Sequence, residues 1–129
     1  MPSLRSIHHI AIICSDYEAS KRFYTDVLGF SIASENYRPE RKSWKLDLKL
    51  NNQYMLELFS FPNPPKRISQ PEACGLRHLA FGVKNLGKSI LALNKKGVAT
   101  EPVRTDLFTG KLFTFFVDPD GLPLELYEL

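Results

Sequence analysis

The apolar positions of this chain follow one pattern that occurs twice. Residues 7–13 and residues 76–82 are both apolar stretches of strand character, and each contains a histidine at the same place, His9 in the first and His78 in the second. The two histidines are 69 residues apart. A pattern that recurs at a fixed spacing indicates that the chain consists of two related modules.

The first module reads as β-α-β-β-β, because the apolar period changes from two to about 3.6 and then returns to two. Ser15 to Glu18 has the Ser-x-x-Glu form of a capping box, and Gly29 stands where a helix usually ends. The expected elements are a strand over 7–14, a helix over about 16–28 with an apolar stripe at Ala19, Phe23 and Val27, strands over 30–37, 44–50 and about 54–61, a charged loop over 38–42 and a turn at Asn51 and Asn52.

The same order restarts after a proline-rich linker at about 62–75. Asn85 can cap a second helix, and Gly97 stands where that helix should end. The expected elements are strands over 76–83, 98–104, 112–117 and 122–127, a helix with apolar positions Leu86, Ile90 and Leu93, and a turn over 118–121. We therefore predict an α+β fold in one domain, 1–129, with tandem βαβββ modules at about 5–61 and 76–129.

Composition narrows the class of protein. The chain has 129 residues, of which 43% are apolar and 24% charged, and no apolar run approaches the roughly 20 residues that span a bilayer. A net charge of +3, spread along the chain, predicts no nucleic acid partner but suits an anionic small molecule. Met1 leads straight into Pro2 and Ser3 without a signal peptide, so we expect a cytoplasmic protein. Cys14 and Cys74 are then expected to be free, buried or half-buried thiols.

Each module also contains one glutamate in a later apolar stretch, Glu57 and Glu125, and these are 68 residues apart. A lone histidine in an apolar strand is usually a hydrogen-bonded core residue, and a glutamate in Leu-Glu-Leu usually faces solvent. Their recurrence at matching positions changes the interpretation, because two carboxylates in an apolar cleft are costly without a cation. The four side chains, His9, Glu57, His78 and Glu125, therefore predict a site for one divalent metal ion.

The choice of His9 over its neighbour follows from strand geometry. His8 and His9 should point to opposite faces of a strand, and only His9 matches His78, since Arg77 occupies the position of His8. Small Ala11, on the same face as His9, would leave room beside the metal.

Cationic and aromatic side chains are candidates for binding an acidic substrate. Solvated surface charge and core packing are the alternative interpretation for each of them, and a plain hairpin turn explains Thr109 to Lys111 as well as a loop at the cleft does. The candidates are Arg38, Arg41, Trp44, Lys45, Arg77, Phe108, Lys111 and Phe113.

These features together resemble the vicinal oxygen chelate superfamily, which includes glyoxalase I, bleomycin resistance proteins and dioxygenases. The resemblance implies paired βαβββ modules in a cupped mixed sheet with helices outside, the metal ligands His9, Glu57, His78 and Glu125, and often a site at a homodimer interface. It covers nearly the whole chain, through His-His-Ile-Ala-Ile at 8–12, Phe-Tyr-x-x-x-Leu-Gly-Phe at 23–30, Leu-Glu-Leu-Phe at 56–59, Arg-His-Leu-Ala-Phe at 77–81 and Asp-Pro-Asp-Gly-x-x-x-Glu-Leu at 118–126.

The same resemblance implies a glyoxalase I-like lyase or isomerase. In such enzymes the metal binds adjacent substrate oxygens and stabilises an enediolate after a glutamate takes a proton; this implies Glu125 as the base and Glu57 as the second catalytic carboxylate. Zinc or nickel is the favoured metal, and cobalt, manganese and iron(II) also suit the ligands. Residues 59–65 depart from the glutathione-dependent relatives, which argues against glutathione as co-substrate.

Three alternatives stay open. A dioxygenase or a thiol transferase of the same superfamily would use the metal differently, although both usually need only three ligands. A non-catalytic binding protein of the antibiotic-resistance type would typically lack the ligand set.

Overall fold

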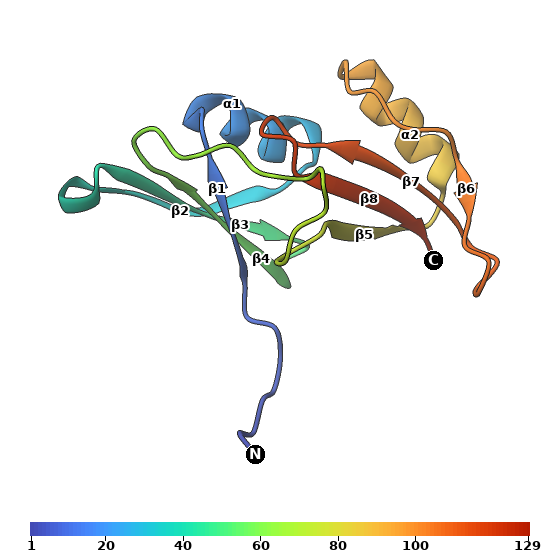
Figure 1. The fold of residues 1–129 in the computed structure, drawn as a ribbon, viewed down its shortest axis with the longest axis horizontal. Coiled ribbons are helices and arrows are strands. Elements are labelled where there is room, and N and C mark those ends of the chain that lie inside the picture. The colour runs from blue at the N-terminus through green and yellow to red at the C-terminus, as the bar shows by residue number, and fades with distance from the viewer. The chain divides into compact units, whose positions relative to one another are not determined.

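The computed structural model describes residues 1–129, apart from the side chain of Tyr54. It divides into two units, Met1–Pro65 and Lys66–Leu129, each with its own four-stranded sheet (Figure 1). We call them unit 1 and unit 2; their boundary falls inside the predicted linker. The strand orders, β1-β4-β3-β2 and β5-β8-β7-β6, are equivalent, so the predicted α+β fold with two βαβββ modules is confirmed.

Unit 1 contains one parallel and two antiparallel strand pairs. β1 pairs with β4 in parallel, while β2 with β3 and β3 with β4 are antiparallel. A left-handed backbone at Asn51 and Asn52 makes the predicted turn before β4. The elements are β1 (Ile10–Cys14), α1 (Tyr17–Arg22), the π-helix η1 (Phe23–Val27), β2 (Ser31–Arg38), the 3-10 helix η2 (Pro39–Arg41), β3 (Ser43–Leu50) and β4 (Tyr54–Ser60).

The helix of unit 1 departs from the prediction at its start and in its last turns. Asp16 rather than Ser15 is the N-cap, and its Oδ1 accepts a hydrogen bond from Ala19 N at 3.1 Å. From Phe23 on, the backbone forms a π-helix, whose wider turn brings Tyr24 fully into the core beside Phe23. The predicted four-residue spacing of the apolar stripe therefore does not hold through the whole helix.

Unit 2 repeats the arrangement, with β5 parallel to β8 and β7 antiparallel to both of its neighbours. Asn85 caps α2 as predicted, since its Oδ1 accepts from Lys88 N at 2.9 Å. Leu86 and Leu93 are buried, in agreement with the predicted apolar stripe of this helix. The elements are β5 (Leu79–Val83), α2 (Leu86–Lys95), β6 (Arg104–Thr105), β7 (Leu112–Val117) and β8 (Pro123–Glu128).

The predicted strand over 98–104 is wrong, because only Arg104–Thr105 pairs as a strand. Glu101 N does donate to Phe115 O at 2.9 Å, but Glu101 O accepts from the Thr114 hydroxyl at 2.6 Å instead of from a neighbouring backbone. Pro102 has no backbone N–H to continue a ladder. A side-chain hydrogen bond thus holds this segment where the sequence predicts strand pairing.

The first strands of both units begin later than predicted. Pairing to the partner strand starts at Ile10 in unit 1 and at Leu79 in unit 2. Ile7 and Leu76, which extend the apolar runs, are 85% and 49% exposed. The apolar pattern therefore overestimates the length of these strands, and both candidate histidines stand just before a strand rather than within it.

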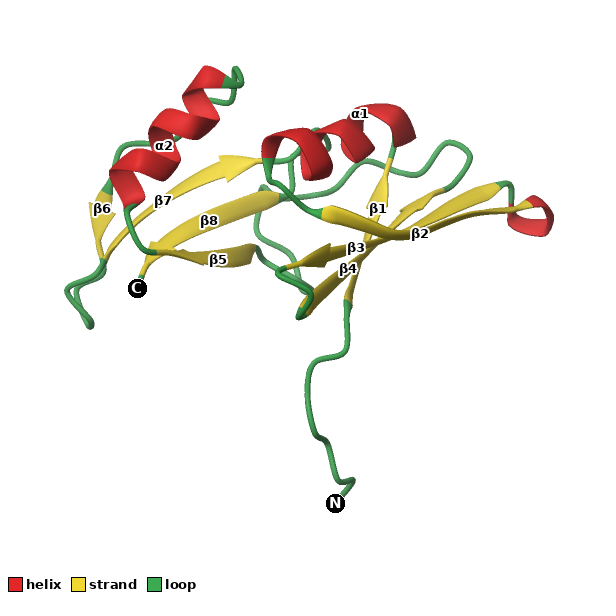
Figure 2. Ribbon diagram, turned by 180° about the vertical axis from the view of Figure 1, so that it is seen from behind, coloured by secondary structure: helices red, strands yellow, loops and turns green.

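Each helix lies on one side of its own sheet (Figure 2). Leu46, Leu48 and Leu58 are at most 1% exposed and form the core of unit 1, and Leu124 is fully buried in unit 2. Because side chains alternate along a strand, the odd-numbered neighbours of these leucines belong to the opposite face. That opposite face carries Glu57 and Glu125, the two candidate glutamates.

The cysteines are both free, but only one is buried. Cys14 is 1% exposed, and its Sγ donates to Phe59 O at 3.3 Å. Cys74 is exposed, contrary to the prediction, because it lies in the linker rather than in a strand. Among the described residues, no helix is long and apolar enough to cross a membrane.

Candidate metal and substrate site

Strand register places each candidate glutamate beside the alanine that stands two positions after the histidine. Glu57 on β4 pairs with Ala11 on β1, and Glu125 on β8 pairs with Ala80 on β5. Both glutamates belong to central strands, so their side chains are covered by neighbours on either side. The two modules therefore have the same backbone pairing around the glutamate.

Each unit brings its own histidine and glutamate together. His9 Nδ1 lies 3.5 Å from Glu57 Oε2, and His78 Nε2 lies 3.3 Å from Glu125 Oε2. The glutamates are only 8% and 9% exposed, so neither is the solvent-facing strand residue that a Leu-Glu-Leu sequence usually contains. Two donors bound to one ion at about 2.0–2.2 Å would be about 3.0–3.4 Å apart, close to both measured separations.

The donor chemistry of these pairs fits a divalent transition metal, since imidazole nitrogen and carboxylate oxygen are ordinary ligands for zinc, nickel and iron. Among the described residues, no group of three or more His, Cys, Asp and Glu side chains that could hold a metal ion is formed. Each unit thus supplies two of the four predicted ligands.

The surroundings of the pair in unit 1 are charged. Lys45 Nζ lies 2.6 Å from Asp47 Oδ1 and 3.8 Å from Glu57 Oε1, and the Ser34 hydroxyl donates to Asp47 Oδ2 at 2.9 Å. Burial acts to raise the pKa of Asp47, but the hydrogen bonds from Lys45 and Ser34 outweigh it and hold that pKa below its usual range. A lysine therefore lies between two carboxylates on this face.

His8 stays close to its neighbour instead of pointing to the other face. The two Nδ1 atoms of His8 and His9 are 2.9 Å apart, and the rings meet edge to face at 5.2 Å. The predicted opposite orientation is wrong, because alternation applies only within a strand and both histidines precede β1.

The surroundings of the pair in unit 2 are aromatic. Phe115 meets the His78 ring edge to face at 5.1 Å, and Phe113 lies 6.0 Å from Phe115. Arg104 on β6 places its guanidinium over both phenylalanine rings, at 5.1 and 5.3 Å. Apolar rings therefore occupy the place that lysine and aspartate occupy in unit 1.

The contact with Arg77 determines which nitrogen of the His78 ring carries the proton. Its Nη1 lies 3.2 Å from His78 Nδ1, and its Nε forms an ion pair with Glu72. Because a guanidinium only donates hydrogen bonds, His78 Nδ1 must accept, and the proton of the neutral ring is then on Nε2, toward Glu125.

Two of the other substrate candidates lie on the same face as Glu57. Lys45 contacts the glutamate directly, and Arg38 packs on the Phe59 ring at 4.9 Å while its Nη2 donates to Ser43 Oγ at 2.9 Å. Arg41 lies near them, 5.3 Å from the Phe61 ring. Trp44 does not share this face; it stacks on Tyr17 of α1 at 5.3 Å and packs on the helix side of the sheet.

The remaining candidates are in unit 2. Phe113 lies near His78 through Phe115, as described above, whereas Phe108 is 98% exposed and Lys111 is exposed at the hairpin between β6 and β7. Asp106 shapes this hairpin by accepting from Phe108 N at 2.8 Å, and that bond, with a second from Tyr127, lowers the pKa of Asp106. The hairpin is thus an ordered turn, and nothing in unit 2 ties Phe108 to His78.

Four further residues, which the sequence patterns did not indicate, contact the predicted ligands or lie beside them. Asp47 and Phe115 are next to the two glutamates in the strand register, and an alignment of the two modules could have found them. Arg67 and Arg104 line a cavity beside His78, and no pattern in the sequence distinguishes them from surface arginines.

Comparison with known proteins bears on this geometry. A model of the Glyoxalase/Bleomycin resistance protein/Dioxygenase superfamily matches residues 6–126. The chain belongs to this superfamily. It is similar to Bacillus subtilis YwkD, with 66% identity over 97% of this chain and 98% of the relative. The crystal structure of a glyoxalase family protein from Enterococcus faecalis matches with a TM-score of 0.91 and 55% identity, over 96% of this chain and 98% of the other.

Two more distant relatives have names that state an activity. A 2-epi-5-epi-valiolone epimerase from an Actinomyces species is 27% identical over the whole of this chain and 82% of its own length. Glyoxylase I 4 of Arabidopsis thaliana is also 27% identical, over 95% of this chain and 70% of its own.

Proposed function

We propose that this protein is a metal-dependent lyase or isomerase of glyoxalase I type. The observation that carries the proposal is the duplicated pair of a buried glutamate and its histidine, one in each unit, at 3.5 and 3.3 Å. His9, Glu57, His78 and Glu125 together bind one divalent metal ion, with zinc or nickel favoured over cobalt, manganese and iron(II). The named activity of the more distant relatives supports the same class of reaction.

When bound, the ion supplies Lewis acidity to two adjacent oxygens of the substrate, which makes a proton on the neighbouring carbon easier to remove. The four ligand side chains would hold the ion and leave room beside it for those oxygens. The substrate that follows from this ligand set is a small molecule with vicinal oxygens, such as an α-hydroxycarbonyl or a thiol adduct of one.

Glu125 is the proposed base that takes the proton. Its Oε2 faces His78, and its Oε1 has no partner among the described residues. Glu57 has both oxygens engaged, Oε2 by His9 and Oε1 by Lys45 at 3.8 Å. A base needs an oxygen free to receive the proton, and this difference favours the glutamate of unit 2.

The proposal includes an anionic substrate, in keeping with the net charge of +3 and the cations beside both pairs. It also includes a homodimer, as is frequent in this superfamily, and a cytoplasmic location.

The test is elemental analysis of protein purified without chelators, in the unmodified chain and in the His9→Ala and His78→Ala variants. We expect about one transition metal ion per chain, lost in both variants. His8→Ala is the matched control, since His8 lies next to His9 but is outside the proposed ligand set, and it should keep the metal.

Activity is then screened with the metal-loaded protein against methylglyoxal hemithioacetals of several thiols and against thiol-free α-hydroxycarbonyls. Metal retained by both histidine variants would contradict the ligand set. Absence of metal even after reconstitution would instead support a small-molecule binding protein.

A further inference from the structure

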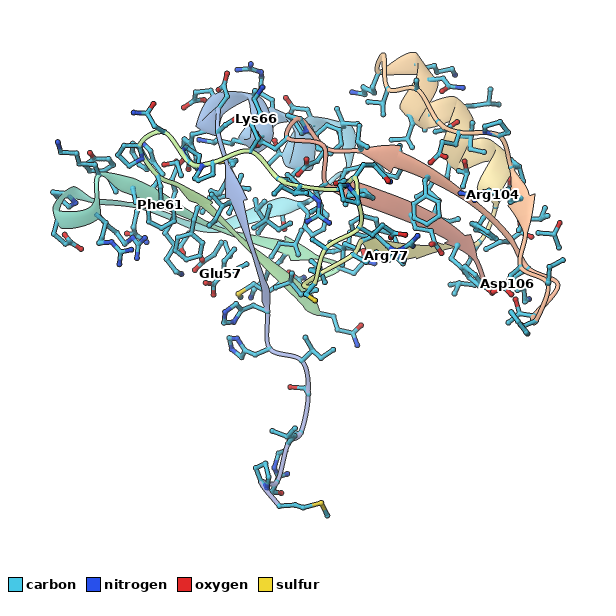
Figure 3. All side chains as sticks on the ribbon, viewed as in Figure 1. Glu57, Phe61, Lys66, Arg77, Arg104 and Asp106 are labelled. Carbon is cyan, nitrogen blue, oxygen red and sulfur yellow. The ribbon has the colours of Figure 1, made fainter. Side chains whose placement is uncertain are left out.

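Unit 2 contains a cavity of about 290 Å³ beside His78. Its lining comes from the linker segment and from residues around the histidine, and all of it belongs to unit 2. Three of the lining residues are arginines, Arg67, Arg77 and Arg104, and two are glutamates, Glu72 and Glu101. The charged lining therefore has an excess of one positive charge, and Figure 3 shows where Arg77 and Arg104 lie in unit 2.

Arg104 has hydrogen-bond donors available for a ligand. Its guanidinium carbon lies 5.1 and 5.3 Å from the ring centroids of Phe113 and Phe115, and the side chain is 54% exposed. Its ion pair with Glu101 is long, 3.8 Å between Nη2 and Oε1, and both side chains are more than half exposed. Such a pair is weak, so a better placed anion can replace it.

Arg67 is held in place before any ligand arrives. Its Nε donates to Ser69 Oγ at 2.9 Å, and its Nη2 donates to Leu76 O at 2.8 Å and Arg77 O at 3.0 Å. Its other terminal nitrogen, Nη1, has no partner among the described residues. Because three hydrogen bonds already hold this guanidinium, it loses little conformational entropy when its Nη1 binds an anion.

We propose that this cavity binds the anionic end of the substrate, a carboxylate or a phosphate, between the guanidiniums of Arg67 and Arg104. The inference rests on the proposed function, because it places the anion next to His78 and the reacting oxygens at the metal. Glu72 does not oppose it, since this carboxylate is already paired with Arg77. The volume lies at the lower end of the range for ligand sites, so the acid is a small one rather than a large conjugate.

Three probes test the pocket by NMR titration of backbone amides and arginine Nε–H groups: inorganic phosphate, lactate and neutral hydroxyacetone. The titrations use protein as purified and chelator-treated protein, and metal content is measured on both samples. We expect phosphate or lactate, but not hydroxyacetone, to shift the signals of Arg67 and Arg104. The stronger of the two anions identifies the acid group of the substrate.

Arg104→Gln should weaken anion binding about 10-fold, and Arg104→Lys should restore part of the loss, because a charge-assisted hydrogen bond is lost in one case and kept in the other. Glu101→Gln should have the opposite effect and tighten binding, since it removes the competing carboxylate. Arg22→Gln is the matched control: Arg22 is an exposed arginine of α1 in unit 1 and does not line the cavity.

Unchanged anion binding in both Arg104→Gln and Glu101→Gln would overturn the inference. This result is independent of the metal test. Anion binding that depends on Arg104 in a protein that takes up no metal would support the pocket and contradict the enzymatic proposal. If the protein binds metal but its anion affinity does not depend on Arg104, the metal site is supported and the pocket is contradicted.

Discussion

The two units surround the same histidine and glutamate with different chemistry. Asp47 pairs in register with Glu57, and the equivalent partner of Glu125 is Phe115. Two residues earlier on the same strands, Lys45 in unit 1 corresponds to Phe113 in unit 2. A charged lysine and aspartate in one unit are therefore replaced by two phenylalanines in the other.

The difference suggests that the two units have different functions at one site, metal binding in unit 1 and proton transfer in unit 2. The charged face of unit 1 engages both oxygens of Glu57, which suits a carboxylate that holds a metal ion. In unit 2 the rings of Phe113 and Phe115 lie beside His78, and one oxygen of Glu125 has no partner among the described residues, which suits a carboxylate that receives a proton. The predictions below test this division, beginning with the largest expected effect.

The first compares Glu125→Gln with Glu57→Gln, using the best substrate from the activity screen. Glu125→Gln removes the proposed base, and kcat should fall about 10³-fold at any metal concentration. Glu57→Gln removes a ligand, so its activity should recover as metal is added. An equal loss in both variants at saturating metal would mean that both glutamates take part in proton transfer, and a larger loss in Glu57→Gln would place the base in unit 1.

The second concerns Arg77. Binding of a metal at His78 Nε2 requires the ring proton on Nδ1, where it would face the Arg77 donor at 3.2 Å. Arg77→Ala should therefore raise metal affinity, by about 10-fold for a change of this kind beside a ligand. The measurement is a competition titration against a chromogenic chelator.

His8→Ala is the counterpart of this change in unit 1, and it should also raise metal affinity. His8 Nδ1 lies 2.9 Å from His9 Nδ1, the nitrogen that faces Glu57, so metal binding at that nitrogen has to break this contact. Arg77→Ala with weaker metal binding than the unmodified chain would show that the arginine supports the ligand instead of competing with the metal.

The third compares the cores of the two units. Thr114 occupies in β7 the position that Leu46 occupies in β3, and its hydroxyl holds Glu101 O at 2.6 Å. Thr114→Val should lower the free energy of unfolding by about 1 kcal/mol, because it leaves that carbonyl without its donor. Urea unfolding measures the change.

Thr100→Val, in the same segment, is the control, since Thr100 makes no side-chain hydrogen bond among the described residues. If both valine variants are as stable as the unmodified chain, the hydrogen bond of Thr114 does not replace the missing strand pairing.

The fourth and smallest effect concerns Lys45. The pKa of Asp47 is lowered in the folded protein, so its contribution to stability is present above the unfolded pKa of about 3.9 and is lost as the pH falls through the lower folded value. Lys45→Met should therefore cost about 0.5 kcal/mol near neutral pH and nothing in strong acid.

The measurement is the urea unfolding midpoint of Lys45→Met and of the unmodified chain, near neutral pH and in strong acid. Lys49→Met is the matched control, because Lys49 lies on the same strand and face without an ion pair among the described residues. A loss of stability in Lys45→Met that persisted in strong acid would assign the effect to packing rather than to charge.

The sequence by itself determined the features that depend on local patterns. The repeat of His9 and Glu57 as His78 and Glu125 predicted the two modules, together with the repeated order of strand and helix periods. These periods can be recognised along the chain without knowledge of distant contacts. The cap at Asn85 was predicted correctly for the same reason, since the side chain bonds to a residue three positions away. The turn before β4 likewise needs only residues that tolerate a left-handed backbone.

Tertiary structure decided what depends on partners far away in the chain. It placed Trp44 against Tyr17, on the face away from Glu57, and it replaced most of a predicted strand with the single hydroxyl bond from Thr114. It also surrounded one glutamate with charge and the other with aromatic rings. The position of each of these side chains depends on its contacts with residues of several strands. The pattern along one strand does not contain those contacts, so it cannot predict the position.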